Sequence, residues 1–212
     1  MNYSFRKKNK TVKYIIIHYT GMNDFNSAYR KLNDVKSEVS CHYLISREGK
    51  IYNLLCPKFK AWHAGTSEWK NVKNLNDYSI GIELENKGHE YGYTNFTNRQ
   101  YHGIKQLIKF LKFNFFIKDK DIVFHSDIAP NRKKDPGEKF LVKKLGIERF
   151  NIHQRKTTSV EELLKLYGFS HNYIKLYKID CIKAVKRSLN YKTINSSISQ
   201  TFKKKFINLL IK

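Results

Sequence analysis

Two kinds of hydrophobic pattern alternate along the first part of the chain. Runs rich in β-branched and aromatic residues predict strands at residues 12–18, 79–85 and 121–125. Residues 41–55 contain two such runs around a Gly-containing turn and predict a hairpin. Apolar residues recur at helical spacing over residues 98–116. This mixture predicts an α/β fold, a mixed central β-sheet flanked by helices.

The last part of the chain has a purely helical pattern. Its predicted helices are residues 160–167, 180–189 and 199–211. Residues 151–159 lack a periodic apolar pattern and are predicted to be a linker. We therefore predict two domains, residues 1–154 and residues 155–212, the second being a small C-terminal three-helix domain.

Charge is the strongest compositional feature. The 212 residues include 41 Lys and Arg against 18 Asp and Glu, a formal net charge of +23. Residues 155–212 contribute 13 basic and 3 acidic side chains, or +10. Such an excess indicates an anionic partner, such as nucleic acid, a membrane surface or an acidic polymer, or else only a lysine-rich solvated surface. Charge alone does not choose among these.

Other features of composition exclude several classes of protein. Aromatic residues make up 14% of the chain and favour a packed core over a disordered one. Three scattered cysteines without a CxxC pair exclude a disulfide framework and a zinc finger. No apolar run approaches the ~20 residues of a membrane span, and no signal-peptide segment is visible. A cytoplasmic location is expected, with the periplasm or cell envelope as the alternative. No feature indicates an oligomeric state.

Two of the eight histidines lie where sites tend to form. His18 and His125 each follow a strongly apolar predicted strand, and strand ends of an α/β sheet are rigid and open to solvent. Asp135 follows ten residues after His125, in a Pro-Gly turn. Two histidines and one carboxylate are the ligand type of a catalytic zinc site with an open fourth position. The alternative is that these histidines are ordinary structural residues.

Such a site also needs a base and a group that stabilises an oxyanion. Glu83 and Glu85 lie on the same face of the strand predicted at residues 79–85. They are either an exposed acidic stripe or carboxylates aimed at the metal. Lys133 lies two residues before Asp135 and is either an oxyanion donor or one more surface lysine.

Five segments of the chain carry a family resemblance, in this order: YIIIHYTG, VSCHYLISREGKIY, AWHAG (residues 61–65), NDYSIGIELEN (residues 76–86) and HSDIAPNRKKDPG (residues 125–137). Together they resemble the zinc-dependent N-acetylmuramoyl-L-alanine amidases of the type-2 amidase and peptidoglycan-recognition fold. The resemblance covers roughly residues 12–140. Aspartate rather than cysteine at position 135 resembles the bacterial muropeptide amidases in particular.

The resemblance implies roles for single residues. His18, His125 and Asp135 match the zinc ligands of the family. Glu83 matches the catalytic glutamate, and Glu85 its non-catalytic neighbour.

Further positions match the family's cleft. Lys133 matches the lysine that stabilises the transition state. Trp62, His63 and Arg132 are implied substrate contacts, with Arg132 meeting a carboxylate of the stem peptide. His42 also matches a family position near the cleft and is interpreted as structural.

The implied reaction is hydrolysis of the amide between N-acetylmuramic acid, or its 1,6-anhydro form, and L-alanine in peptidoglycan or muropeptides. A zinc-bound water activated by Glu83 would attack the carbonyl, while zinc and Lys133 would hold the oxyanion. The segment VEELLKLYGF, which opens the helical part, resembles the start of a small peptidoglycan-binding-like domain found in some bacterial amidases.

Two alternatives belong to other functional classes. One is a peptidoglycan-recognition module without catalysis, although such proteins typically lack a zinc ligand and none is missing here. The other is a basic nucleic-acid-binding protein, but the chain has no zinc knuckle, single-strand-binding motif or recognition helix. We therefore expect peptidoglycan or a muropeptide as the partner, and no nucleic acid.

Overall fold

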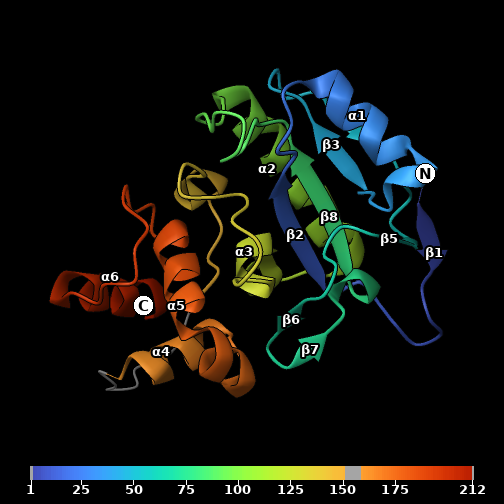
Figure 1. Cartoon of the computed structure of the whole chain (residues 1–212). Coiled ribbons are helices and arrows are strands. Elements are labelled where there is room, and N and C mark those ends of the chain that lie inside the picture. The colour runs from blue at the N-terminus through green and yellow to red at the C-terminus, as the bar shows by residue number, and fades with distance from the viewer. Residues whose placement is uncertain (1, 151–158, 212) are drawn as a thin grey trace.

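The computed structural model describes residues 2–150 and 159–211, and its centre is a five-stranded sheet (Figure 1). The strands of this sheet are β2 (Tyr14–Tyr19), β3 (Tyr43–Ile45), β4 (Ile51–Asn53), β8 (Ser79–Leu84) and β9 (Ile122–Phe124). They lie in the order β4-β3-β8-β2-β9. The last four are parallel, and β4 pairs with β3 in antiparallel fashion as the predicted hairpin. The predicted mixed sheet flanked by helices is confirmed.

Several small elements at the edges of the sheet were not predicted. They are β1 (Tyr3–Phe5), α1 (Phe25–Asn33), β5 (Phe59–Ala61), β6 (Glu68–Trp69) and β7 (Val72–Lys73), together with 3-10 turns at Val35–Ser37, Leu75–Asp77, Asp119–Asp121 and Val142–Leu145. β1 pairs with β5, and β6 pairs with β7. In Figure 1, α1 lies near the carboxyl end of β8, whereas β6 and β7 lie near the opposite end of the sheet.

The alternation of side chains along β2 assigns its two faces. Ile15 and Ile17 pack into a hydrophobic cluster with α2 (Asn98–Phe115), which lies behind the sheet in Figure 1. Tyr14 and Ile16 point the other way and join a second cluster. Both faces of β2 are covered, which explains its uninterrupted run of apolar residues.

The second cluster contains the C-terminal helices, which are α4 (Val160–Tyr167), α5 (His171–Ser188) and α6 (Gln200–Leu210). Leu163, Tyr167 and Phe206 share this cluster with Tyr14 and Ile16. In Figure 1 the helices gather on one side of the sheet, with the short helix α3 (His125–Ile128) between them and β2. They therefore complete the core of the sheet rather than forming a separate one.

One predicted helix lacks its first half, and one predicted strand boundary was wrong. α5 is kinked at Tyr177, where the backbone is not helical, and the helix predicted at residues 180–189 corresponds to the segment after this kink. The segment from His171 to the kink was not predicted. The strand predicted at residues 121–125 ends at Phe124, whose N–H donates to the Asp127 carboxylate at 2.9 Å, and His125 opens α3.

The domain division stays a prediction. Apart from Ser159, the linker predicted at residues 151–159 lies outside the described residues. In the described part of the chain, no helix is long and apolar enough to cross a membrane.

A buried polar network ties α3 to the C-terminal helices. Asp127 accepts hydrogen bonds from Arg149 and from the Tyr167 hydroxyl, the latter at 2.7 Å. Ser188 lies 2.7 Å from the same hydroxyl, and the Arg149 Nε donates to the carbonyl of Ile122 at 2.8 Å. Because Asp127 is two residues from His125, this network fixes the backbone that carries His125.

Candidate metal centre and active-site cleft

Strand parity brings His18 and Glu83 together. His18 lies on the same face of β2 as Tyr14 and Ile16, towards α3. On β8, Ile80 and Ile82 face α2, so Glu83 faces the opposite way, as His18 does. His18 is the register partner of Glu83 in the parallel pair β2 and β8. Adjacent strands lie about 4.8 Å apart, so the two side chains start as direct neighbours.

Asp135 reaches the same point through a folded-back loop. The Ser126 N–H donates to the Asp135 carbonyl at 2.9 Å, which closes the loop after α3. His125, at the start of this loop, is buried, and so is Asp135 at its end. The predicted Pro-Gly turn thus brings the Asp135 carboxylate back to the end of β9, beside His125.

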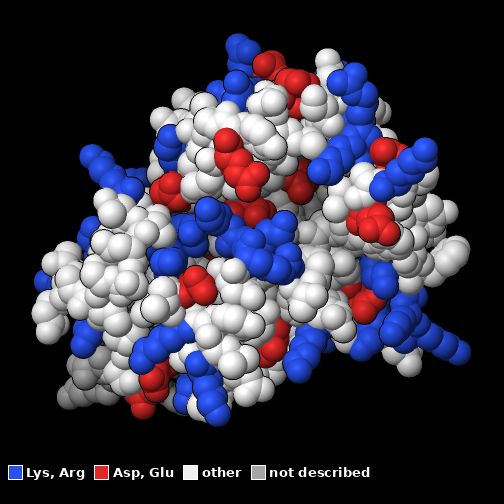
Figure 2. Space-filling model, viewed as in Figure 1, with Lys and Arg blue, Asp and Glu red and all other residues white. Residues whose placement is uncertain are grey.

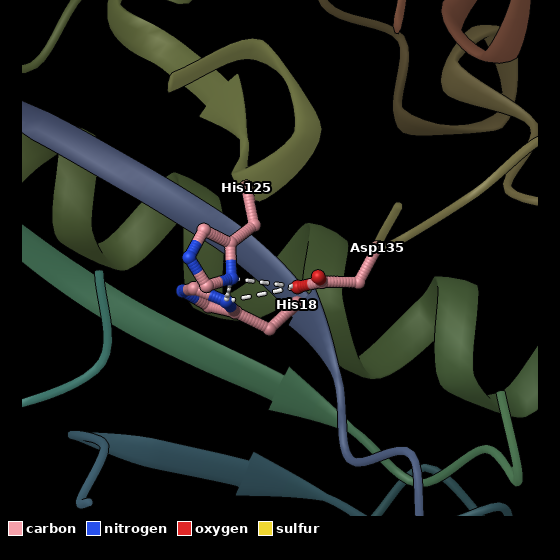
Figure 3. A group of neighbouring side chains, drawn as sticks. All are labelled: His18, His125 and Asp135. Carbon is pink, nitrogen blue, oxygen red and sulfur yellow. Dashed lines mark hydrogen bonds and ion pairs between the residues drawn. The ribbon is translucent and has the colours of Figure 1, made fainter. Parts of the chain in front are cut away.

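The three predicted ligands converge (Figure 3). Nδ1 of His18 lies 2.9 Å from Nδ1 of His125, and Oδ2 of Asp135 lies 3.1 Å and 3.0 Å from these two atoms. A tetrahedral zinc ion with bonds of 2.0–2.1 Å holds its ligand atoms roughly 3.3 Å apart. In the described part of the chain, these residues form the one group of three or more His, Cys, Asp or Glu side chains that could hold a metal ion.

Hydrogen bonds on the far side of each imidazole decide which nitrogen carries the proton. Nε2 of His125 lies 3.2 Å from the Ala64 carbonyl, which can only accept. His125 therefore donates there, and its Nδ1 presents a lone pair to the cluster. Second partners of this kind orient metal-binding histidines in many proteins.

A longer chain of hydrogen bonds orients His18. Nε2 of His18 lies 3.0 Å from Nδ1 of His63, whose Nε2 lies 3.2 Å from the Ser79 hydroxyl. That hydroxyl donates to the Leu75 carbonyl at 2.6 Å. Working back from the carbonyl, Ser79 accepts from His63, and His63 accepts from His18. Nδ1 of His18 is thereby left without a proton.

These assignments aim the lone pairs of two imidazole nitrogens and a carboxylate oxygen at one point. With atoms about 3 Å apart this is repulsive unless a cation lies among them. The donor set therefore fits a divalent metal ion.

Gly81 makes room for the second imidazole of this chain. A Cβ at position 81 would lie 2.5–2.7 Å from ring atoms of His63. Gly81 has the same parity as Ser79 and Glu83 on β8. The pattern Ser-x-Gly-x-Glu therefore places a hydrogen-bond acceptor for His63, a space for its ring, and the carboxylate of Glu83 in a row along one face.

Burial and neighbouring charges shift the pKa values of the site. Burial, together with the charge of His125, lowers the pKa of His18 to about 4. Burial acts to raise the pKa of Asp135, but its place between the imidazoles of His125 and His18, where positive charge is favoured, holds that pKa below its ordinary value. The imidazole stays neutral and the carboxylate stays ionised, and these are the protonation states that bind metal.

Glu83 differs from Asp135. Burial and the negative charge of Asp135 raise its pKa well above the ordinary value, and the opposing charge of Lys133 only lessens this rise. Its Oε2 is inaccessible to solvent and has no hydrogen-bond partner in the described residues. A carboxyl group in this state holds a proton strongly, and the side chain of Glu83 also lines the cleft.

The cluster opens into a cleft of about 320 Å³. Its walls include the predicted residues Trp62, His63, Glu83, Arg132 and Lys133, along with the three ligands. In the view of Figure 1, Lys and Arg side chains gather near the middle of the face, over the end of β2 and α3 (Figure 2). The cleft therefore favours an anionic ligand.

Some predicted residues are partly engaged with the protein itself. The Trp62 indole N–H donates to the Ser4 hydroxyl at 3.0 Å, and Arg132 donates to the carbonyls of Ala64 and Thr66. His63 is buried against His18, as described above. Its contact with substrate stays a prediction.

Glu85 and His42 have structural roles. Glu85 lies beyond the end of β8 and accepts the backbone N–H of Arg47 at 2.8 Å, so it holds the neighbouring turn. His42 accepts from the Gly81 N–H at 3.0 Å and donates to the Phe59 carbonyl at 3.1 Å.

Sequence reasoning missed a hydrogen-bonded tyrosine, histidine and glutamate at the wall of the cleft. The Tyr19 hydroxyl lies 2.9 Å from Nδ1 of His89, and Nε2 of His89 lies 3.1 Å from the Glu138 carboxylate. Tyr19 and His89 both line the cleft. Tyr19 follows the ligand His18 directly, which was the one available signal, but nothing in the sequence pairs it with His89.

Comparison with known proteins gives a consistent result. A profile of the family described as N-acetylmuramoyl-L-alanine amidase matches residues 8–138. The chain is 35% identical over 187 residues to the N-acetylmuramoyl-L-alanine amidase AmiD of Escherichia coli, covering 74% of this chain and 67% of that protein. It is 40% identical over 103 residues to the 1,6-anhydro-N-acetylmuramyl-L-alanine amidase AmpD of Haemophilus influenzae, covering 48% of this chain and about half (54%) of AmpD.

Solved structures agree over nearly the whole chain. Escherichia coli AmiD, in complex with the substrate anhydro-N-acetylmuramic acid-L-Ala-D-gamma-Glu-L-Lys, superposes with a TM-score of 0.78 at 29% identity, covering 93% of this chain and 88% of AmiD. AmpDh3 of Pseudomonas aeruginosa, in complex with anhydromuramic pentapeptide, superposes with a TM-score of 0.80 at 26% identity, covering 98% and 95%. Both similarities extend through the C-terminal helices.

Proposed function

Because this chain belongs to the N-acetylmuramoyl-L-alanine amidase family, we propose that it is a zinc enzyme that hydrolyses the amide joining N-acetylmuramic acid to L-alanine. The observation that carries this proposal is the convergence of His18, His125 and Asp135 beside the unpartnered carboxyl oxygen of Glu83. The substrate class is an anhydro-muropeptide, which is the molecule held by the AmiD and AmpDh3 structures.

The zinc would be held by Nδ1 of His18, Nδ1 of His125 and a carboxylate oxygen of Asp135. Its chemistry when bound is to act as a Lewis acid and to lower the pKa of a water ligand to about 7. The protein supplies the remainder: neutral imidazoles with fixed tautomers, an ionised carboxylate, and a rigid sheet edge that holds all three.

Glu83 would act as the general base and then as the general acid. Its carboxylate takes a proton from the attacking water as the new C–O bond forms at the amide carbonyl. The same carboxyl then gives that proton to the alanine nitrogen as the C–N bond breaks. The products are a free carboxylate on the lactyl group and a peptide with a free amino terminus. The raised pKa of Glu83 suits a group that must hold the proton between these steps.

Lys133 would stabilise the oxyanion that forms on the carbonyl oxygen. It lines the cleft and lies close enough to Glu83 and His18 to shift the pKa of both. An ammonium group that is already in place needs no reorganisation when the negative charge develops.

We assign the binding of the substrate to the walls of the cleft. Arg132 lines the cleft, and although Nε and one terminal nitrogen bond the loop at residues 64–66, its other terminal nitrogen has no hydrogen bond to a described residue and would meet a carboxylate of the stem peptide. The half-buried ring of Trp62 offers an apolar surface beside it. His63 has both nitrogens engaged, so its role is to orient His18 rather than to bind substrate.

For the C-terminal helices we propose a supporting role. They share a hydrophobic cluster with β2 and hold α3 through Asp127. The peptidoglycan-binding function implied by the sequence for residues 155–212 stays a prediction, as does the cytoplasmic location.

The proposal is tested with a Glu83→Gln variant on purified anhydro-muropeptide. We expect turnover to fall by about 10²-fold or more, while zinc content and thermal stability remain those of the wild type. Glu85→Gln is the matched control, because the amide can still accept the Arg47 N–H, and it should keep full turnover. Full activity of Glu83→Gln would refute the assignment of the base, and no activity of the wild type would refute the proposed reaction.

A further inference from the structure

The outer face of α2 and the residue that follows the helix carry three exposed phenylalanines. Phe110, Phe113 and Phe116 have exposed fractions of 56%, 82% and 89%. Phe110 and Phe113 lie on the side of α2 away from the buried stripe that packs against the sheet, and Phe116 is the C-cap of the helix, with a left-handed backbone. No ring contact joins any of them to another described aromatic side chain. Burying these rings against a partner would remove a large apolar surface from water.

Positive charge predominates around these rings, although Lys112 of α2 forms an ion pair with Asp119. The 18 residues of α2 include four Lys and Arg and not one Asp or Glu. Lys105 and Lys109 are exposed on the face that carries Phe113. Aromatic rings flanked mainly by cations are complementary to a membrane surface, which has anionic headgroups above an apolar interior.

Beside Phe116 the surface forms a shallow hollow of about 270 Å³. Phe115 and Phe116 form its apolar side, and Lys13, Lys118 and Lys120 supply ammonium groups. Its one carboxylate is Asp121, whose charge is opposed by Lys118, Lys120 and Lys70. The hollow thus combines an apolar wall with a net positive charge, which suits a phosphate headgroup attached to an acyl chain.

This surface lies away from the catalytic cleft. Val12 and Tyr14, where β2 begins, line the hollow, whereas His18, near the end of β2, lines the cleft. Tyr14 and His18 are four steps apart along the strand, or about 13 Å. An occupant on α2 would therefore leave the cleft open.

We propose that the outer face of α2, with the adjoining hollow, docks this enzyme on a bilayer that contains anionic phospholipids. The phenylalanines enter the interface between headgroups and acyl chains, and the lysines lie among the phosphates. A second copy of this chain is the poorer occupant, because two such faces would bring lysines against lysines. The inference does not depend on the amidase activity.

The experiment measures co-sedimentation of the full chain with vesicles at about 0.1 M salt. One set of vesicles is equal parts phosphatidylcholine and phosphatidylglycerol, and the other is phosphatidylcholine alone. We expect binding to the anionic vesicles that weakens at high salt. The double variant Phe113→Ser/Phe116→Ser should bind about tenfold less tightly or worse. Lys118→Gln/Lys120→Gln should weaken binding by about fivefold for each lysine.

Matched controls come from other faces of the molecule. Phe5→Ser removes a phenylalanine that is 77% exposed on β1, and Lys165→Gln/Lys204→Gln removes two exposed lysines from α4 and α6. Both should bind as the wild type does, and all variants should keep amidase activity on a soluble muropeptide. Absence of vesicle binding by the wild type, or equal losses in the control variants, would overturn the proposal. A dimer that the double phenylalanine variant converts to monomer would also overturn it, in favour of self-association.

Discussion

The hydroxyl of Tyr167 offers a sharp test of how the C-terminal helices hold the metal site. This hydroxyl donates to Asp127 at 2.7 Å and lies 2.7 Å from Ser188, inside a fully buried network. Tyr167→Phe removes the oxygen alone. The ring keeps its contacts with Trp69 and Phe150, so hydrophobic packing is preserved.

The expected loss follows from the charge of the acceptor. A hydrogen bond to a charged group contributes about 1.5–3 kcal/mol, and a buried acceptor left without its donor adds to the cost. Asp127 still retains Arg149 and the Phe124 N–H. We therefore expect the free energy of unfolding to fall by about 2–3 kcal/mol, which for a chain of this size lowers Tm by roughly 5–10 °C.

Urea unfolding followed by tryptophan fluorescence makes the measurement. Trp69 lies against Tyr167 and Trp62 lies in the cleft, so the two report on both regions at once. We expect one transition, displaced in the variant, together with weaker zinc binding through the loosened His125. Tyr29→Phe is the control, since its exposed hydroxyl makes no hydrogen bond to a described residue. A loss below about 0.5 kcal/mol for Tyr167→Phe would refute the reasoning.

Four further variants test other parts of the site. His63→Ala should weaken zinc binding by about 10- to 100-fold in a chelator competition, and unchanged affinity would show that His63 does not orient His18. Gly81→Ala places a Cβ within 2.5–2.7 Å of the His63 ring and should weaken zinc binding similarly, whereas wild-type affinity would contradict the packing argument. Lys133→Met should lower kcat by about 10²- to 10³-fold at unchanged zinc content, while a change in KM alone would make it a binding residue. Burial lowers the pKa of His42 to about 3, so this ring is neutral in the folded chain and protonated below pH 6.5 in the unfolded one. The contribution of the neutral ring to stability is therefore complete above pH 6.5 and is lost at about 1.4 kcal/mol per pH unit from there down to about pH 3. In His42→Asn, the free energy of unfolding measured in urea should fall less steeply with decreasing pH over this range, by the equivalent of one bound proton.

The elements predicted correctly are those whose signal is local. The strand β8 and the helices α2 and α4 are bounded by runs of apolar residues at one period, and they occur within one or two residues of the prediction. α1 was missed because only Ala28 and Leu32 are buried in its nine residues, too few to show a period. β1 pairs with β5 more than fifty residues away, and nothing local marks such a pair.

The site, like the fold, has features that the sequence predicts and features that it does not. The alternation of faces along β2 and β8 is readable from sequence, but the pairing and register that place His18 beside Glu83 are seen only in the structure. The hydrogen bond between His18 and His63 joins residues 45 positions apart, and its acceptor chain ends at a serine without any motif of its own. Such contacts depend on the packing of the segment around residue 63 against Gly81, which no periodicity encodes.

Hydrolysis in water enriched with oxygen-18 tests the central claim most directly. The wild type is incubated with anhydro-N-acetylmuramyl peptide, and the products are separated and their masses are measured by mass spectrometry. The proposed function predicts a peptide beginning with unlabelled L-alanine and one heavy oxygen in the lactyl carboxylate of the sugar, with no products after the metal is removed by chelation and full recovery when zinc is returned. Release of a peptide that lacks L-alanine, or products that form at the same rate without metal, would contradict it.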